Sequence, residues 1–451
     1  MPDTALPPLL RRRSTDEYLP PPAASVEQRA QARALEAVHR QAAARRQSPP
    51  AFARSRSGTA AALRALDIEA GGGFFELTPD TERSDDAADA SFDDPGGPPV
   101  VDVQTHLVNP ARFVGPSADA LRAYLRTADQ DRWGDGVDGA ELAPDVWAHA
   151  VFGASETALA LITAPPGADD SRVVTNPEIA DCRSIVDRRA GTGRVLTHAI
   201  VHPNITGELE TMATWASECE PSGWKVYPLY GPDPDRPGWF LDDDTGTAFL
   251  EQVRSLGPRR VAIHKGISGA IANASPPGAS PHDVGPAAAA FGDIDFLVYH
   301  SGYEPNIDEG AHRPGGTGVD VLIDSCATHG IGADGNVYAE LGSTWHLVVR
   351  RPEQAAHVLG KLLVAFGSER ILWGTDSIWY GSPQPLIDAF RAFTIPERMQ
   401  EAHGYPPLTL DDKRRILGGN APTVYDTAVT ERTDDWVAEA ADELSHRFPA
   451  G

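Results

Sequence analysis

The sequence predicts an α/β fold, a (β/α)8 TIM barrel, and two observations favour it. Six strand-like stretches each end in a polar side chain that can bind a metal ion, and they follow one another in the order a barrel requires. A barrel strand is buried on both faces, so it should be an apolar run with functional groups only at its C-terminal end. The six stretches are residues 100–106, 223–225, 261–264, 296–300, 337–340 and 371–376. Together they indicate a metal centre at the barrel mouth.

Two more stretches complete a count of eight strands, namely 158–163 and 194–202, and the fourth strand continues to Tyr227. Helices are expected between the strands. One should begin near Asn176, a plausible N-cap with Pro177 at the first helical position. The others are predicted over 246–256, 286–291 and 352–366.

The chain divides into three predicted parts. Residues 1–98 form an N-terminal extension, with a helix over 26–46 and a partly flexible, acidic, Gly/Pro-rich strap over 80–99. Residues 99–427 form the metal-dependent barrel, and residues 428–451 form a charged C-terminal helix. The strap is expected to lack regular structure.

Composition narrows the class of protein. The net charge of −25 argues against a nucleic-acid partner, because phosphate binding needs a basic surface. No apolar run approaches the length of a membrane span. Cys182, Cys219 and Cys326 lie far apart and suit a reducing cytoplasm. We therefore expect a cytoplasmic enzyme without nucleic-acid or membrane partners.

The first candidate metal ligands lie on strand 1. Alternate residues of a strand share a face, so Gln104 and His106 should both face the barrel mouth. His264 and His300 end strands 5 and 6, and imidazole is a common ligand of catalytic metals. Asp376 ends strand 8, where a carboxylate can bind metal or accept a proton. Taken alone, His106 could equally be a buried structural residue, whereas for His264 and His300 a ligand role is favoured over a core position.

Two further candidates have open roles. Lys225, at the end of strand 4, is either a buried cation paired with a carboxylate or a carboxylated lysine that bridges two metals. Glu340, at the end of strand 7, is either a ligand or an outer partner that orients a histidine. The candidate catalytic residues are therefore Asp376, Glu340 and Lys225.

Side chains around the mouth favour a bulky, partly apolar small-molecule substrate. The candidate substrate-binding residues are His202, Tyr227, Tyr303, Glu304, Trp345 and Trp379. An acidic protein that binds an acyl-CoA would need a local basic patch. Its conceivable members are Arg254, Arg259, Arg260 and Lys265. A homodimer through the N-terminal arm or the last helix is a further expectation.

Residues 100–425 resemble the amidohydrolase superfamily, in its amidohydrolase-2-like branch. The motifs that carry the resemblance are the strand-1 motif, Gly223-Trp224-Lys225, His264, Tyr299-His300-Ser301-Gly302, Gly374-Thr375-Asp376 and Leu417-Gly418-Gly419-Asn420-Ala421. The resemblance implies one or two divalent metals and hydrolysis of C–N, C–O or P–O bonds, or decarboxylation of aromatic acids. A metal-bound water would be the nucleophile, and Asp376 would manage its proton.

The chain departs from the family at Gln104, where members usually carry the first histidine of a His-x-His pair. An amide oxygen suits an oxygen-rich iron site with Glu340 and Asp376 better than it suits zinc. The chain is also similar to an offshoot of this superfamily that uses two non-haem irons and dioxygen to hydroxylate carbons in natural-product biosynthesis. That group is thought to favour CoA-linked substrates.

Three functions compete. The first is a non-haem diiron monooxygenase of secondary metabolism, in which an apolar pocket keeps the oxidant on the substrate. The second is a hydrolase or decarboxylase that uses one or two Zn, Mn or Fe ions. The third is a metal-free barrel that serves as a binding module. Gln104 and Glu340 favour the first, which we prefer narrowly, whereas frequency in the superfamily favours the second.

Overall fold

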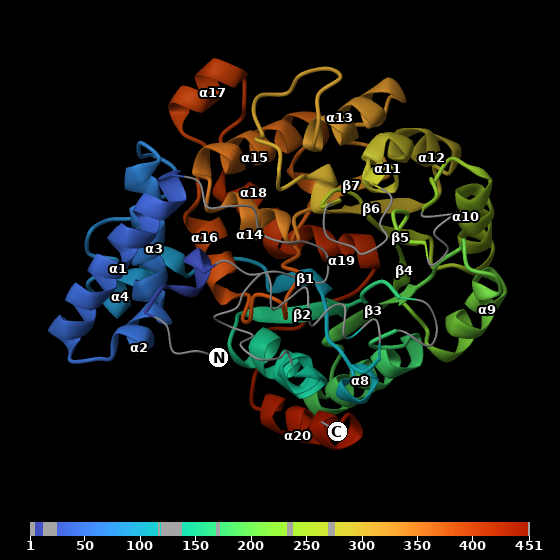
Figure 1. Ribbon diagram of the computed structural model, residues 1–451, viewed down its shortest axis with the longest axis horizontal. Coiled ribbons are helices and arrows are strands. Elements are labelled where there is room, and N and C mark those ends of the chain that lie inside the picture. Colours follow the sequence, from blue (N-terminus) through green and yellow to red (C-terminus); the bar gives the residue numbers. More distant parts are fainter. Residues whose placement is uncertain are drawn as a thin grey trace.

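The computed structural model describes residues 5–11, 25–115, 118, 138–167, 172–231, 238–268 and 276–449. Eight parallel strands lie in the order β1 to β8 and surround the centre of the molecule (Figure 1). Their bounds are Val100–Thr105, Thr157–Ile162, Val195–Ile200, Gly223–Val226, Arg260–His264, Asp295–Tyr299, Val337–Glu340 and Ile371–Leu372. A parallel bridge between Thr105 and Ser377 joins the first strand to the segment that follows the last one. The predicted (β/α)8 barrel is confirmed.

Helices form an outer ring around the strands (Figure 1). They include α8 (Asn176–Ala190), α9 (Glu208–Glu218), α10 (Asp244–Leu256), α12 (Val284–Ala290), α13 (Val319–Thr328), α15 (Pro352–Phe366) and α16 (Gln384–Ala392). The N-cap of α8 is Thr175, one residue before the predicted Asn176, because Thr175 and Glu178 form a reciprocal capping box. The predicted helix at 352–366 has the expected bounds.

Shorter helices lie in the connections between the strands and after β8. They are α7 (Pro144–Ala148), α11 (Pro276–Ala279), α14 (Thr344–Val348), α17 (Glu397–His403), α18 (Leu410–Arg414) and α19 (Asn420–Tyr425). A π-helical turn, Arg415–Gly419, joins α18 to α19.

Apolar side chains inside the barrel form a cluster separate from the larger one between strands and helices. Val101 and Val103 of β1 belong to the inner cluster, and so do Ala421, Val424 and Tyr425 of α19. Because α19 contributes to the inner cluster, it covers one end of the barrel. Arg260, the first residue of β5, donates a hydrogen bond to the carbonyl of Val424. The covered end is therefore the N-terminal end of the strands, and the polar strand ends lie at the opposite end.

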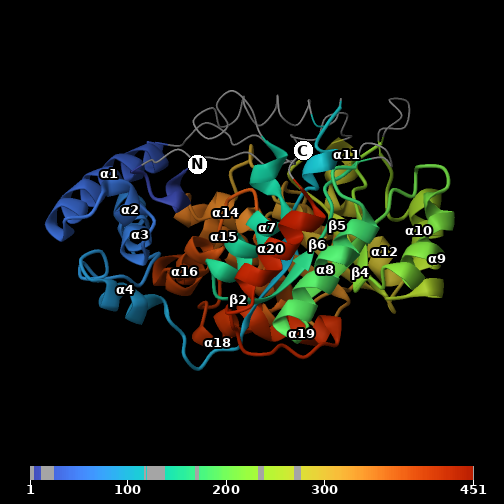
Figure 2. The same cartoon turned by 90° about the horizontal axis from the view of Figure 1, so that it is seen from below.

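The N-terminal extension is a helical unit beside the barrel (Figures 1 and 2). It contains α1 (Ser25–Arg45), α2 (Pro49–Ala53), α3 (Arg56–Glu69) and α4 (Asp85–Phe92). The prediction that residues 80–99 form an irregular strap is wrong for α4. Ser84 caps this helix by accepting a hydrogen bond from Ala87 N, and Phe92 buries its ring. The buried ring of Phe92 therefore helps to stabilise α4, which the acidic composition of this segment did not predict.

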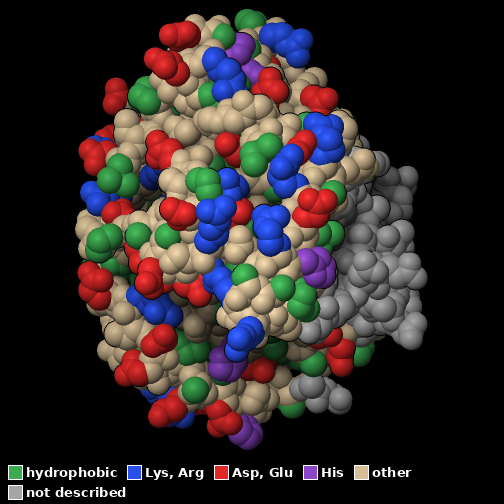
Figure 3. Space-filling model, turned by 90° about the vertical axis from the view of Figure 1, so that its left-hand side faces the viewer, with side chains coloured by type: hydrophobic (Ala, Val, Ile, Leu, Met, Phe, Trp, Pro, Cys, Tyr) green, Lys and Arg blue, Asp and Glu red, His purple; other side chains and the backbone are tan. Residues whose placement is uncertain are grey.

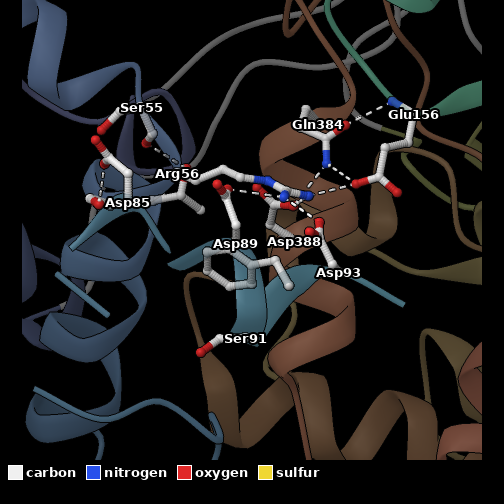
Figure 4. Close-up of polar contacts among 12 residues, drawn as sticks. Ser55, Arg56, Asp85, Asp89, Ser91, Asp93, Glu156, Gln384 and Asp388 are labelled. Carbon is white, nitrogen blue, oxygen red and sulfur yellow. Dashed lines mark hydrogen bonds and ion pairs between the residues drawn. The ribbon is translucent and has the colours of Figure 1, made fainter. Parts of the chain in front are cut away.

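Arg56 of α3 pairs with Asp89 and Asp93 of this unit and with Glu156 and Asp388 of the barrel, and so joins the two (Figure 4). The side of the molecule formed by the N-terminal helices carries acidic and basic side chains interspersed (Figure 3). At the other terminus, helix α20 spans Val437–Arg447. It is shorter than the predicted helical segment 428–451. Among the described residues, no helix is both long enough and apolar enough to span a membrane.

Candidate functional site

A β-bulge in β1 directs Gln104 and His106 toward the barrel mouth. Asp102 pairs with Ala160 and Thr105 with Ile162, so β1 has one extra residue between these pairs. Before the bulge, Val101 and Val103 face the barrel interior. Thr105 then faces outward, where its hydroxyl donates to Leu161 O at 2.7 Å. The bulge therefore places Gln104 on the inner face directly after an inward-facing valine.

Asp102 holds this bulge in place. Its Oδ1 atom accepts hydrogen bonds from Gln104 N at 3.1 Å and Thr375 N at 3.0 Å, and its Oδ2 atom accepts one from Thr375 Oγ1. Burial raises the pKa of this carboxyl group to about 7. Asp102 thus pairs backbone amides of β1 and of the segment after β8, on both sides of the point where the barrel closes.

Asp376, His106 and Gln104 contact one another in a fully buried group. His106 Nδ1 lies 2.8 Å from Thr163 O, which places the proton on Nδ1 and the lone pair on Nε2. His106 Nε2 is 2.8 Å from Asp376 Oδ1. Gln104 Nε2 donates to the same Oδ1 atom at 3.1 Å. The predicted residues of strands 1 and 8 therefore lie together.

His264 and His300 form a second pair, with ring centroids 4.7 Å apart. His300 Nδ1 lies 2.7 Å from Gly342 O, so its Nε2 atom holds the lone pair. Glu340 supports His300, because Glu340 Oε2 accepts from His300 N at 3.2 Å. Glu340 Oε1 accepts from Gly342 N at 2.6 Å. Both oxygens of Glu340 thus accept hydrogen bonds from backbone N–H groups, one of which belongs to His300.

Burial raises the pKa of Glu340 to about 8. Two glycines make room for this side chain and for Gln104. A Cβ atom on Gly374 would overlap Glu340 Oε1, and one on Gly342 would overlap Gln104 Oε1. The carboxyl group of Glu340 and the amide of Gln104 therefore share one narrow space between β1, β7 and β8.

Backbone strain concentrates at the C-terminal ends of four strands. Positive φ angles occur at Ile267 after β5, His300 and Ser301 after β6, Ser343 after β7 and Asp376 after β8. Values of 69° for His300 and 62° for Asp376 are unfavourable for residues with a side chain. Such conformations persist where the surrounding structure enforces them, and they gather at functional sites.

Lys225 lies among aromatic rings. Its Nζ atom is 3.9 Å from the ring centroid of Tyr299 and 4.4 Å from that of Tyr227. The Tyr227 ring stacks on His264 at 5.2 Å, and Trp379 lies 5.9 Å from His106. Tyr227 and Trp379 therefore flank the two histidine-containing groups with apolar surface.

Three other residues predicted to bind substrate lie near the mouth, but their polar groups form hydrogen bonds with neighbouring parts of the protein. His202 Nε2 accepts from Gly167 N at 3.3 Å, and burial lowers its pKa to about 3, so its ring is neutral. Glu304 accepts from the amide and hydroxyl groups of Ser268, and burial raises its pKa. Tyr303 is buried, and its carbonyl accepts from Ile267 N at 2.8 Å.

Trp345 packs in the outer layer and does not line the mouth as predicted. Its N–H group donates to Leu386 O at 3.0 Å, and its ring packs edge-on against Phe390 and Phe393. Trp345 follows strand 7, but the helical turn of α14 directs its ring toward α16 and away from the barrel axis.

The proposed basic patch for an acyl-CoA also differs from expectation. Lys265 is fully buried and donates to Asp283 and to two backbone carbonyls. Arg254 and Arg259 both pair with Asp293. Arg260 lies at the covered end of the barrel. These side chains therefore do not form a basic patch at the mouth.

The imidazole nitrogens and carboxylate oxygens at the mouth are of the kinds that bind divalent metals. They belong to two pairs of side chains, His106 with Asp376 and His264 with His300. Within the described part of the chain, no three His, Cys, Asp or Glu side chains form a ready-made metal group. However, His106 Nε2 and Asp376 Oδ1 are two acceptors that face each other at 2.8 Å, an arrangement that calls for a cation or a proton between them. Gln104 Oε1 is buried and accepts no hydrogen bond from the described residues. Backbone carbonyls also fix the proton-bearing nitrogens of His106 and His300, as is usual for metal ligands.

Two contacts of this site were absent from the sequence-based list. Ser343 Oγ donates to Asp376 Oδ2, and Tyr380 OH lies 2.6 Å from Ser343 Oγ. Both residues closely follow barrel strands, which is the only local signal that could have indicated them. Ser343, which contacts Asp376 directly, has a positive φ angle that no sequence pattern reveals.

Comparisons with known proteins place this geometry in a family. The amidohydrolase family model matches residues 101–427. A search of curated protein sequences finds no match. Among solved structures, similar chains include 2,6-dihydroxybenzoate decarboxylase from Rhizobium, with 13% identity and a TM-score of 0.41 over 73% of this chain and 99% of that one.

A probable 2-pyrone-4,6-dicarboxylic acid hydrolase from Acinetobacter baumannii is similar at 12% identity, with a TM-score of 0.46 over 73% of this chain and 99% of that one. A third similar structure is 5-carboxyvanillate decarboxylase from Sphingomonas paucimobilis, at 14% identity and a TM-score of 0.40 over 73% of this chain and 99% of that one. With sequence identities and TM-scores this low, the three structures do not indicate the function of this chain. The family match spans the whole barrel and every strand-end residue described above, and the chain therefore belongs to the amidohydrolase family.

Proposed function

We propose that the protein is a metal-dependent hydrolase that acts on a small-molecule substrate at the barrel mouth. The observation that supports this most directly is the buried pair of His106 Nε2 and Asp376 Oδ1, two acceptor atoms 2.8 Å apart. A divalent cation would satisfy both atoms. Membership of the amidohydrolase family supports the same assignment.

The residues that would hold a single Zn²⁺ or Mn²⁺ ion are His106, His264, His300 and Asp376, with the Gln104 amide oxygen as an additional donor. When bound, the metal would supply a Lewis acid that activates water and polarises the bond to be cleaved. Imidazole and carboxylate donors suit both metals.

Other residues of this chain would prepare the reaction. Asp376 would accept the proton that the attacking water loses, because its carboxylate lies inside the donor group. Glu340 would hold His300 in orientation through the His300 backbone amide. Tyr227 and Trp379 would exclude water around the substrate, and Lys225 would attract a negatively charged substrate group.

The site favours this function over a diiron monooxygenase. Glu340, the second carboxylate expected in an oxygen-rich iron site, uses both oxygens to accept backbone N–H groups. Asp376 is then the carboxylate that contacts a histidine of the group. The residues suggested for binding an acyl-CoA are also paired or buried elsewhere. Iron, dioxygen and secondary metabolism therefore find no support in the site.

Decarboxylation is a second candidate function, favoured by Lys225. This ammonium group is fully buried against Tyr227 and Tyr299. A buried lysine beside these rings would attract a substrate carboxylate that approached it, because the low local dielectric increases the electrostatic interaction. A hydrolase and a decarboxylase would differ in the product formed, whereas the residues that hold the metal would be the same.

The test begins with elemental analysis of the full chain purified from cells supplied with zinc, manganese and iron. The protein is then stripped with a chelator, reloaded with one metal at a time, and incubated with a panel of esters, amides, lactones and aromatic carboxylic acids. We expect about one Zn²⁺ or Mn²⁺ per chain and metal-dependent hydrolysis that incorporates oxygen-18 from water. Release of CO2 without oxygen-18 in the organic product would establish the decarboxylase. Two irons per chain with oxygen consumption would overturn the proposal.

A further inference from the structure

We propose that Ser343 and Tyr380 form a hydroxyl clamp that positions the carboxylate of Asp376 for metal binding. This inference rests on the proposed function, because Asp376 is a ligand only if the site holds a metal. The two residues belong to different segments: Ser343 follows β7, and Tyr380 lies four residues after Asp376 in the connection that follows β8. They meet beside Asp376 Oδ2.

The hydrogen bonds of the clamp have one consistent direction. Ser343 Oγ donates its single proton to Asp376 Oδ2. Tyr380 OH, 2.6 Å from Ser343 Oγ, must then donate to that oxygen, because the serine has no second proton to give. Both hydroxyl groups thus direct their protons toward the carboxylate. A donor that is itself polarised by a second donor makes a stronger hydrogen bond to the carboxylate and so holds it more firmly.

The clamp also gives the two carboxylate oxygens of Asp376 different partners. Oδ2 is held by Ser343, whereas Oδ1 faces His106 Nε2 and Gln104 Nε2. Without a donor on Oδ2, the carboxylate could rotate and move Oδ1 away from the histidine. Terminal carboxylate torsions are broad and two-fold, so packing alone defines them poorly. A fixed Oδ1 is what a metal ligand requires.

Backbone strain supports a role beyond packing. Ser343 has φ 52° and Asp376 has φ 62°, so both partners of the short contact lie in a conformation unfavourable for residues with a side chain. The protein accepts two strained residues at the point where their side chains meet. Strain of this kind is usual where function needs one geometry.

The ring of Tyr380 is held by stacking on the ring of His346. The Tyr380 ring lies 3.7 Å from that of His346, nearly parallel to it. His346 belongs to α14, and its carbonyl accepts from Arg350 Nε at 3.3 Å. Arg350 also donates to Arg11 O and approaches the carboxylate of Glu27 in α1. The N-terminal extension therefore contacts the segment on which the clamp is built.

The test measures metal affinity and needs no substrate. Full-length protein is stripped of metal and titrated with Mn²⁺ by electron paramagnetic resonance, for wild type, Ser343→Ala, Tyr380→Phe and Ser325→Ala. We expect about 10–100-fold weaker Mn²⁺ binding for Ser343→Ala, as for loss of an outer partner of a metal ligand. Tyr380→Phe should weaken binding less, because Ser343 still donates to Asp376. Ser325→Ala removes a distant buried hydroxyl that makes two hydrogen bonds and should bind Mn²⁺ like wild type.

Tyr380→Phe separates positioning from packing, since the phenyl ring retains the stack on His346 and loses only the hydroxyl group. A changed visible absorption spectrum of the Co²⁺-loaded Tyr380→Phe protein would report an altered ligand geometry and support the clamp. Thermal melting of the stripped proteins checks folding, and if Ser343→Ala does not fold, Tyr380→Phe decides. Wild-type affinity and spectrum in both variants would overturn this inference alone. A wild-type protein that binds no Mn²⁺, Zn²⁺ or Co²⁺ would overturn the proposed function together with the inference.

Discussion

Two groups of charged and polar side chains in this protein differ in how completely their atoms are paired. At the joint between α3 and the barrel, Arg56 Nη1 contacts Asp89 and Asp93, and Nη2 contacts Glu156 and Asp388 (Figure 4). Gln384 bridges the last two carboxylates with hydrogen bonds of 2.7 and 2.8 Å. Each of these contacts joins a donor to an acceptor.

At the barrel mouth, acceptors face acceptors. His106 Nε2 lies against Asp376 Oδ1, and Gln104 Oε1 accepts no hydrogen bond from the described residues. Buried polar atoms without a partner cost free energy, so a protein keeps them where a ligand completes the set. The comparison suggests that the contacts of Arg56 at the joint stabilise the fold, whereas the acceptor atoms at the barrel mouth serve to bind a ligand. The following predictions test that division.

The largest effect is expected at the joint. Arg56→Met would leave the buried carboxylate of Asp388 without its cationic partner, and breaking a buried ion pair destabilises a protein by about 3–5 kcal/mol. Urea denaturation of the stripped protein measures the loss. Arg29→Met is the matched control, because its pair with Glu69 is half exposed and worth about 0–1 kcal/mol. Equal stability of the two variants would show that the joint is not a stabilising element.

Asp376→Asn should give the opposite pattern. Mn²⁺ affinity should fall by more than the roughly 100-fold expected of an outer partner, while the stripped protein keeps its free energy of unfolding. The reason is that the new amide N–H group can face the lone pair of His106 Nε2, and the Gln104 amide can turn its Oε1 atom toward the same group. Calorimetric metal titration and urea denaturation measure both quantities. A large loss of stability with unchanged Mn²⁺ affinity would place Asp376 among the structural residues.

Gly374→Ala tests how tightly the mouth is packed. The added methyl group would overlap Glu340 Oε1, and forced overlap in a packed site costs about 1–3 kcal/mol. Gly292→Ala is the control, because a methyl group there meets no atom within 4 Å. The free energy of unfolding of both variants is measured in urea. Full tolerance of alanine at position 374 would indicate that Glu340 has room to move.

The smallest effect is a pH dependence at the joint. Burial raises the pKa of Asp388 from 3.8 to about 6. Between these values the folded protein binds more protons than the unfolded chain, so the contribution of Asp388 to stability falls as pH rises and levels off above the folded pKa. Asp388→Asn should therefore show a flatter decline of the free energy of unfolding across this window. Parallel pH profiles of the two proteins would contradict the raised pKa.

Much of the barrel could be predicted from the sequence, because a strand buried on both faces leaves a local apolar signature. The strand ends at His106, His264 and Asp376 were predicted from that signature together with their polar last residues. The helix α4 was not, since its acidic composition resembles a loop and its stability comes from Phe92 packing against distant elements. Trp345 was misplaced for a similar reason: its ring direction depends on α14 and α16, which are separate in sequence.

The sequence by itself determined which donor atoms reach the mouth, since strand order and periodicity are local properties that bring strand ends to one face. Only the tertiary structure decided which atom faces which. The hydrogen bonds of Asp102 with Thr375, of Glu340 with His300 and of Ser343 with Asp376 each join segments far apart in the chain. Such contacts depend on distances and torsions established only when the barrel closes, so no local pattern encodes them.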